Sequence, residues 1–191
     1  MSRLPSLPPL DAPTVGVCLV CTGNICRSPM AEVALRHLAA ATPLPSGPLP
    51  SGTLADRLRL SSAGTGPWHE GEPMDERAAV ALAVAGYGRH PHVAHQFDLH
   101  AVDPGRADRV DLVVAMDRRH QQTLRSLTGG RLPDDRIVLL RTFDPQAGGA
   151  VDVPDPYYGD QADFDACLAM IEAGCRGLVQ ALSTALVAGA G

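Results

Sequence analysis

The sequence predicts an α/β fold in which a four-stranded parallel sheet lies between two layers of helices. Four short segments have the apolar or alternating pattern of strands, and helical segments separate them along the chain. Such alternation is typical of a parallel sheet that is buried on both faces, the middle layer of a three-layer sandwich. The predicted strands are residues 15–20, 58–63, 111–116 and 137–140.

The first predicted helix begins directly after the first strand and its loop. Ser28 and Pro29 are residues favoured at the N-cap and at the first helical position. They precede residues 30–41, which are rich in Ala and Leu and have one apolar face. We therefore expect the amino end of a helix, with its free backbone N–H groups, to face the loop.

Three further helices and one short edge strand are expected. The edge strand covers residues 93–97, and the last helix contains Gly174 and Gly177, which weaken its helical signal. Residues 98–108 and 141–159 are expected to be connections. The helices run from about residue 74 to Gly86 or Gly88, from Asp117 to about Leu127, and from about Asp163 to Val187.

The length of 191 residues fits one domain, which we place at residues 14–188. Residues 1–13 contain four prolines and are expected to form a flexible tail. Residues 42–56 are rich in proline and glycine and are expected to form a mobile surface loop.

Composition limits the classes of function. The formal net charge of −5 argues against a nucleic-acid-binding protein, because such domains have a basic face. No apolar run approaches the roughly 20 residues of a membrane helix, and the amino terminus has no apolar signal core. We expect a cytoplasmic protein without a membrane partner, a monomer or weak dimer, and leave export by a signal-independent route open.

Five cysteines raise the question of a metal site, because Cys18, Cys21 and Cys26 lie close together in the sequence. No second Cys-x-x-Cys pair completes a four-ligand set, and the histidines form no ligand spacing of their own, so we expect neither a metal nor another cofactor. Cys167 and Cys175 lie in the last predicted helix, where core packing is the usual role of cysteine.

The loop after the first strand has the features of an anion-binding site. Backbone N–H groups at a helix start converge on one point, and the planar guanidinium of Arg27 binds two oxygens of a tetrahedral anion. A thiol placed beside a cation and a helix start ionises readily, so Cys21 is a candidate nucleophile. The expected phosphate-binding loop follows Cys21 with Thr22, Gly23, Asn24, Ile25, Cys26, Arg27 and Ser28.

Two side chains of this loop have expected supporting roles. Ser28 is placed to donate a hydrogen bond to the Cys21 thiolate, which improves the thiolate as a leaving group, and this role is compatible with capping the helix. Asn24 tolerates a left-handed backbone, and its side chain is expected to fix the shape of the loop.

These residues resemble the low-molecular-weight protein tyrosine phosphatases, most closely the bacterial members. The string from Val20 to Glu32 carries the Cys-x5-Arg-Ser pattern. Three more matches follow in the family's order: residues 62–73 with Trp68, residues 115–118, and residues 155–159. The resemblance covers about residues 15–185. It implies a flavodoxin-like fold with strand order 2-1-3-4 and hydrolysis of phosphotyrosine in protein substrates through a phosphocysteine.

The resemblance also implies roles outside the loop. It places the general acid at Asp155, and the chemistry needs a group that protonates the leaving oxygen and later activates water. Trp68, Tyr157 and Tyr158 would form the walls of the substrate cleft. His69 lies near Trp68 in the sequence and is a further candidate for substrate contact. Asp117 and Asp144 are weaker candidates for the acid, with structural roles expected.

Cys26 has two open interpretations. In family members with this pair of cysteines, a disulfide to the nucleophile protects it from over-oxidation, so Cys26 is a candidate redox partner of Cys21. The other interpretation is that Cys26 only fills space in the loop.

Two other functions fit part of the pattern. A thioredoxin-coupled arsenate reductase uses the same fold and loop, but it needs two more cysteines in a flexible segment near the third strand, and residues 111–130 contain none. A non-catalytic phosphotyrosine-binding module would keep Arg27 and dispense with Cys21 or Asp155. Because both residues are present, a phosphatase is the expected function.

Overall fold

The computed structural model describes residues 5–44 and 51–189, and it confirms the predicted α/β architecture. The strands form one parallel sheet in the order β2-β1-β3-β4. They are β1 (Val15–Cys21), β2 (Leu58–Gly64), β3 (Leu112–Ala115) and β4 (Ile137–Leu139).

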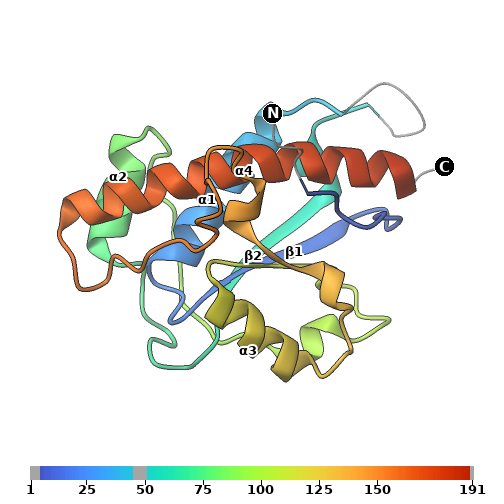
Figure 1. Cartoon of the computed structure of the whole chain (residues 1–191), viewed down its shortest axis with the longest axis horizontal. Helices are drawn as coiled ribbons and strands as arrows, with labels where there is room; N and C mark the ends of the chain where they lie inside the picture. The colour runs from blue at the N-terminus through green and yellow to red at the C-terminus, as the bar shows by residue number, and fades with distance from the viewer. Residues whose placement is uncertain (1–4, 45–50, 190–191) are drawn as a thin grey trace.

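Helices cover both faces of the sheet (Figure 1). Helix α1 (Arg27–Ala41), α2 (Glu76–Val84) and α4 (Gln161–Gly189) lie on one face, and α3 (Arg118–Thr128) lies on the other. Short 3-10 helices occur in the connections. They are η1 (Leu54–Arg57), η2 (Leu99–Val102), η3 (Asp134–Arg136) and η4 (Leu140–Phe143).

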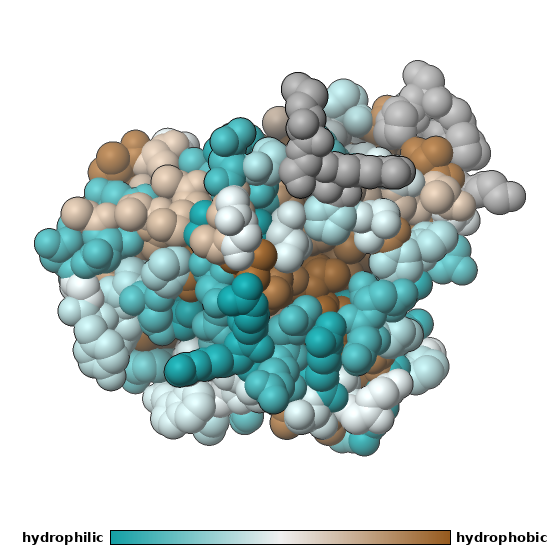
Figure 2. Space-filling model, in the orientation of Figure 1, coloured by the Kyte–Doolittle hydropathy of each residue, from teal (hydrophilic) through white to brown (hydrophobic). Residues whose placement is uncertain are grey.

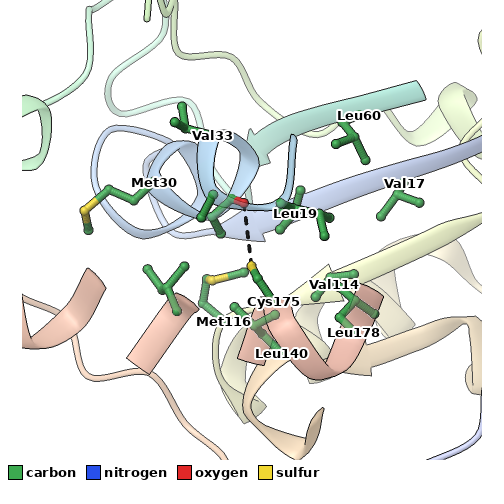
Figure 3. Close-up of a cluster of buried hydrophobic side chains, with 14 of the residues drawn as sticks. Val17, Leu19, Met30, Val33, Leu60, Val114, Met116, Leu140, Cys175 and Leu178 are labelled. Atoms are coloured by element: carbon green, nitrogen blue, oxygen red, sulfur yellow. Dashed lines mark hydrogen bonds between the residues drawn. The ribbon is translucent and has the colours of Figure 1, made fainter. Parts of the chain in front are cut away.

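The core has two parts because β1 is buried on both faces. Val17 and Leu19 belong to the larger cluster against α1 and α4, which Figure 3 shows, and Cys18 and Val20 belong to the smaller cluster on the α3 side. A strand buried on both faces has a continuous apolar sequence, whereas the edge strand β2 alternates buried and half-buried residues over its first half.

Helix α4 runs unbroken through Gly174 and Gly177, although glycine is a poor helix former. The close packing of η4 against the helix explains why glycine is found at both positions. A Cβ atom on Gly174 would lie 2.9 Å from the carbonyl oxygen of Leu140, and one on Gly177 would collide with the carbonyl oxygen of Phe143. The missing side chains let η4 pack directly on the helix. The helix is also longer at both ends than the predicted 163–187.

The predicted flexible tail is instead packed against the domain over residues 5–13. The Leu10 side chain is only 1% exposed, and the Leu10 N–H donates to the carbonyl oxygen of Ala185 at 3.1 Å. Arg57 donates to the carbonyl oxygen of Pro13, and Arg136 donates to that of Pro9. The apolar side chains of the segment therefore extend the core, and residues 1–4 lie outside the described residues.

The described ends of the predicted mobile loop, residues 42–44 and 51–56, are joined to each other by backbone hydrogen bonds. Residues 45–50 lie outside the described residues, but Pro43 and Thr53 form an antiparallel bridge on either side of them. Leu54 is fully buried and begins η1, so the last part of the predicted loop is anchored in the core.

Two local predictions are wrong. Helix α1 begins at Arg27 with Cys26 at its N-cap, so Ser28 is the second helical residue and not the cap. Its hydroxyl is used inside the loop instead. Residues 93–97 form no strand, since the pairing is a single bridge between Gly64 and Gln96.

Polar residues cover most of the visible surface around α3, and apolar residues gather along and below α4 (Figure 2). Among the helices of the described chain, none has both the length and the apolar character that crossing a membrane requires.

Candidate active site

The predicted phosphate-binding loop joins the carboxyl end of β1 to the start of α1. Parallel sheets of this type bind ligands at the carboxyl ends of their strands. Two backbone bonds fix the loop to the end of β2: the N–H of Thr65 donates to the carbonyl oxygen of Cys21 at 2.8 Å, and that of Gly66 donates to the carbonyl oxygen of Thr22 at 3.2 Å.

Asn24 holds the turn of the loop. Its φ angle is 59°, the only positive φ at a non-glycine residue in the described chain. Its fully buried amide donates to the hydroxyls of Ser28 at 2.9 Å and Ser62 at 3.0 Å, and its side-chain oxygen accepts from the N–H of His95 at 3.1 Å. The imidazole Nε2 of His92 lies 2.6 Å from the carbonyl oxygen of Asn24.

The Cys21 thiol lies at the bottom of the loop and is 2% exposed. Its sulfur is 3.0 Å from the Ser28 hydroxyl, which is also 3.2 Å from the carbonyl oxygen of Ala63. The hydroxyl accepts from Asn24, so its one proton is free for either neighbour. A negatively charged sulfur is the stronger acceptor, and the arrangement therefore suits a thiolate.

Four acceptors surround the buried guanidinium of Arg27. Nη1 donates to Asp117 Oδ2 at 3.0 Å and to the carbonyl oxygen of Val153 at 3.3 Å, and Nη2 donates to Asp155 Oδ2 at 2.5 Å and to the Thr22 hydroxyl at 3.1 Å. The Nε atom is buried and makes no hydrogen bond with the described residues. This atom is therefore left to bind an oxyanion.

A cavity of about 230 Å³ opens above the loop. It has a charged floor and an aromatic rim, where the Trp68 side chain is 67% exposed. The Tyr157 and Tyr158 rings are 5.0 Å apart and nearly perpendicular, and Nδ1 of His69 is 2.7 Å from Glu72. The lining residues are Cys21, Thr22, Gly23, Ile25, Cys26, Arg27, Trp68, His69, Asp155, Tyr157 and Tyr158.

Arg77 connects the segment that contains Asp155 to the phosphate-binding loop. Its guanidinium donates to the carbonyl oxygens of Tyr157 at 3.0 Å and Gly159 at 2.8 Å, and it pairs with Asp75. The N–H of Asp75 donates to the carbonyl oxygen of Ile25 at 2.9 Å. A continuous set of hydrogen bonds thus links the two sides of the cavity.

Residues 16–188 match the family model described as low molecular weight phosphotyrosine protein phosphatase. The chain belongs to this family.

Named relatives of this low-molecular-weight protein-tyrosine phosphatase cover nearly the same length. A low molecular weight protein-tyrosine-phosphatase of Streptomyces coelicolor is 44% identical, over 88% of this chain and 94% of the relative. The low molecular weight protein-tyrosine phosphatase A of Mycobacterium tuberculosis is 42% identical, over 85% and 88%. The crystal structure of YfkJ from Bacillus subtilis is 30% identical and superposes with a TM-score of 0.69, covering 90% of this chain and 96% of that chain.

Most of the predicted site residues of this phosphatase line its cavity. Asn24 and Ser28 do not line it, since they are fully buried behind the loop. Trp68 is exposed on the rim and does not anchor its loop in the core. Asp144, the other weak candidate for the acid, is buried beside Arg141 at 3.6 Å, away from the cavity.

Sequence reasoning missed or undervalued several neighbours of the phosphate-binding loop. Asp117 has two roles, because one oxygen binds Arg27 and the other caps α3 by accepting from the N–H of His120. Its position directly after a predicted strand could have marked Asp117 as a site residue, because ligands bind at the carboxyl ends of parallel strands. Arg77, His92 and His120 act through contacts that are distant in sequence, and no local pattern marks them.

All five cysteines are free thiols in this phosphatase. Cys26 lines the cavity with Cys21, and burial, reinforced by the Asp75 carboxylate, raises the pKa of the Cys26 thiol. A neutral thiol beside Cys21 is compatible with both interpretations of Cys26, so its redox role stays a prediction. Cys167 and Cys175 are buried in α4, and burial raises the pKa of Cys167 to about 12.

Proposed function

We propose that this phosphatase hydrolyses phosphotyrosine monoesters in proteins through a phosphocysteine on Cys21. One observation carries the proposal: Cys21, Arg27 and Asp155 line the same small cavity, with the thiol at its floor. The match to the phosphatase family and the relatives named as protein-tyrosine phosphatases support it.

The first step is attack of the Cys21 sulfur on phosphorus, which forms the S–P bond as the P–O bond to the leaving phenol breaks. Arg27 and the loop N–H groups bind the equatorial oxygens, on which charge is concentrated in the transition state. Ser28, 3.0 Å from the sulfur, stabilises the thiolate form before attack and again when the S–P bond breaks.

Asp155 is assigned both proton transfers. In the first step it gives its proton to the leaving oxygen, and in the second it takes a proton from the water that attacks phosphorus, so the enzyme is regenerated. Its carboxylate pairs with Arg27. A phosphate dianion that takes over the guanidinium frees Asp155 from Arg27, so that its carboxyl can reach the leaving oxygen.

The depth of the nucleophile supports preference for aryl esters. Because Cys21 is 2% exposed, the phosphate has to enter the cavity, and a long flat phenyl group can pass between the rim side chains of Trp68 and Tyr157. The shorter chains of phosphoserine and phosphothreonine leave their backbone against this rim.

The test is hydrolysis of p-nitrophenyl phosphate and phenyl phosphate in EDTA by wild type, Cys21→Ser and Asp155→Ala. We expect Cys21→Ser to be inactive. For Asp155→Ala we expect a loss of about 10²- to 10⁴-fold with phenyl phosphate and a smaller loss with p-nitrophenyl phosphate, because nitrophenolate needs less help from an acid. Asp160→Asn, an exposed acidic residue on the same segment, is the matched control and should retain activity.

Full activity of Cys21→Ser would contradict the phosphocysteine mechanism, and equal losses on both esters in Asp155→Ala would contradict the role of Asp155. Arsenate-dependent oxidation of reduced thioredoxin would indicate the reductase instead. The buried positions of Cys167 and Cys175 in α4 argue against that outcome.

A further inference from the structure

His120 is the most deeply buried histidine of the described chain and contacts the phosphate-binding loop at Thr22. It belongs to α3, on the opposite face of the sheet from α1, and is 5% exposed. It does not line the cavity that contains Cys21. Its imidazole Nε2 is 2.8 Å from the Thr22 hydroxyl, and Nδ1 is 3.0 Å from Asp117 Oδ1, without the alignment of a hydrogen bond.

Four side chains therefore form a closed ring around one edge of the guanidinium. Arg27 contacts Asp117 Oδ2 through Nη1 and the Thr22 hydroxyl through Nη2. His120 contacts the same Thr22 hydroxyl and the other carboxylate oxygen of Asp117. Asp117 is itself fixed, since Oδ1 accepts the N–H of His120 at 2.8 Å as the cap of α3. The Thr22 side chain is exposed, so these contacts are what hold its orientation.

The protons in the ring can be assigned from the neighbours. Burial lowers the pKa of His120 to about 4, and nearby Arg27 adds to this, while the carboxylates of Asp117, Asp155 and Asp152 oppose it. The imidazole is therefore neutral near pH 7. Because the Thr22 hydroxyl accepts from Arg27, it donates to Nε2, and the imidazole proton lies on Nδ1, facing the Asp117 carboxylate.

We propose that His120 is a positioning residue of the phosphatase reaction, which acts through the Thr22 hydroxyl to hold the Arg27 guanidinium in the orientation that the phosphoryl transition state needs. The inference rests on the proposed function of the same site. The ring fixes Nη1 and Nη2, which sets the direction of the unpaired Nε toward the bound anion. A fixed donor favours the transition state more than the ground state, so the effect belongs in kcat.

The first test compares Thr22→Val, His120→Leu and the double variant with p-nitrophenyl phosphate as substrate. Each single variant should lower kcat about 3- to 10-fold, the factor that one hydrogen bond contributes, with little change in KM. The double variant should lose no more than Thr22→Val alone, because His120 acts through the hydroxyl that Thr22→Val already removes. Multiplied losses in the double variant would overturn the proposal.

The second test replaces His120 with glutamine or asparagine, whose amide groups reach the places of different ring nitrogens. The amide of His120→Gln can reach the place of Nε2 and accept from Thr22, whereas that of His120→Asn reaches only the place of Nδ1. We expect His120→Gln to keep most of the wild-type kcat and His120→Asn to resemble His120→Leu. Equal activities of the Gln and Asn variants would contradict the proposal.

The third test separates positioning from packing. Inhibition by vanadate, which resembles the pentacoordinate transition state, should weaken more than inhibition by phosphate in Thr22→Val and His120→Leu. Equal weakening would indicate a role in ground-state binding only and would overturn the proposal. His90→Gln, at an exposed histidine, is the control. Thermal unfolding identifies variants that do not fold, and Thr22→Val, at an exposed position, keeps the test valid.

Failure of the proposed function would give a different result. If Cys21→Ser were fully active, the phosphocysteine mechanism would fail whatever the His120 variants did. If Cys21→Ser were inactive and the Thr22 and His120 variants were unchanged, only the positioning role would fail.

Discussion

At position 24 the loop needs a left-handed backbone together with a side chain that donates two hydrogen bonds and accepts one. Asparagine tolerates that backbone better than other residues with a side chain, and its amide provides both kinds of group. Glycine would provide only the backbone. The bonds of Asn24 to Ser28 and Ser62 also orient the hydroxyl that faces Cys21, so the shape of the loop and the state of the thiol depend on the same residue.

Substitutions of Asn24 separate these two contributions. Asn24→Gly should lower the free energy of unfolding by about 2–4 kcal/mol, because three hydrogen bonds of a buried side chain are lost. Asn24→Ala should cost ~1 kcal/mol more, because it adds strain at φ 59°. Urea unfolding measures both values, and kcat/KM should fall in both variants. If Asn24→Ala were as stable as Asn24→Gly, backbone strain would be unimportant at this position.

The sequence predicts contacts between residues of one loop better than contacts between distant segments. Cys21, Arg27 and Ser28 lie within one loop, so their spacing contains most of their geometry. The pairing of Arg27 with Asp117 joins residues 90 positions apart, and that of Thr22 with His120 joins residues 98 positions apart. Such contacts follow from the order of the strands, which places the carboxyl ends of β1 and β3 side by side.

At the scale of elements, the site depends on the connection between α2 and the segment of residues 155–159. Arg77, in the first turn of α2, donates to two carbonyl oxygens of that segment, and its guanidinium lies 4.5 Å from the centre of the Phe164 ring. Asp75, the N-cap of α2, links the same arginine to Ile25 of the phosphate-binding loop. Helix α2 therefore links the phosphate-binding loop that contains Cys21 to the segment that contains Asp155.

Arg77→Met tests this connection, because methionine keeps the apolar contact with Phe164 and removes the hydrogen bonds. We expect kcat with phenyl phosphate to fall more than kcat with p-nitrophenyl phosphate, since a loosened Asp155 protonates the leaving group less often. Arg106→Met is a matched control: Arg106 also pairs with an aspartate two residues away but does not line the cavity. Equal losses on the two esters in Arg77→Met would show that the connection does not serve the acid.

The hydrophobic pattern of each segment predicts whether it forms a helix or a strand better than it predicts the residues at which the element begins and ends. Continuous apolar runs marked β1 and β3 as buried strands, and the alternation in residues 58–63 fits the position of β2 at the edge of the sheet. The start of α1 was misplaced because Ser28 has the chemistry of a cap, while the structure uses its hydroxyl for Cys21. Glycines 174 and 177 weakened the prediction of α4, because their close contact with η4 is not visible in the sequence.

At the scale of the whole molecule, segments far apart in the sequence complete one domain. Leu10 packs near the end of α4, so the amino-terminal and carboxy-terminal segments support each other. Proline content predicts a separate flexible tail over residues 1–13, whereas Leu7 and Leu10 are buried in the described part of this segment. Proline content indicates how many conformations the backbone of a segment can adopt. Whether the segment is buried depends on the apolar surface that the rest of the domain offers it.

The buried histidine also links the site to the stability of the whole molecule. The pKa of His120 is about 4 in the folded protein, against 6.5 for an exposed histidine. Between these values the unfolded chain binds a proton that the folded chain does not, so the free energy of unfolding falls as the pH falls from 6.5 to 4. The full loss of the free energy of unfolding is ~3 kcal/mol, and it is absent above pH 6.5.

The free energy of unfolding of His120→Gln should therefore fall less steeply with pH than that of wild type, in urea unfolding measured across this range, and His90→Gln should follow wild type. Parallel declines in wild type and His120→Gln would mean that His120 is not held neutral by the fold, and the assignment of its Nδ1 proton would fail with it.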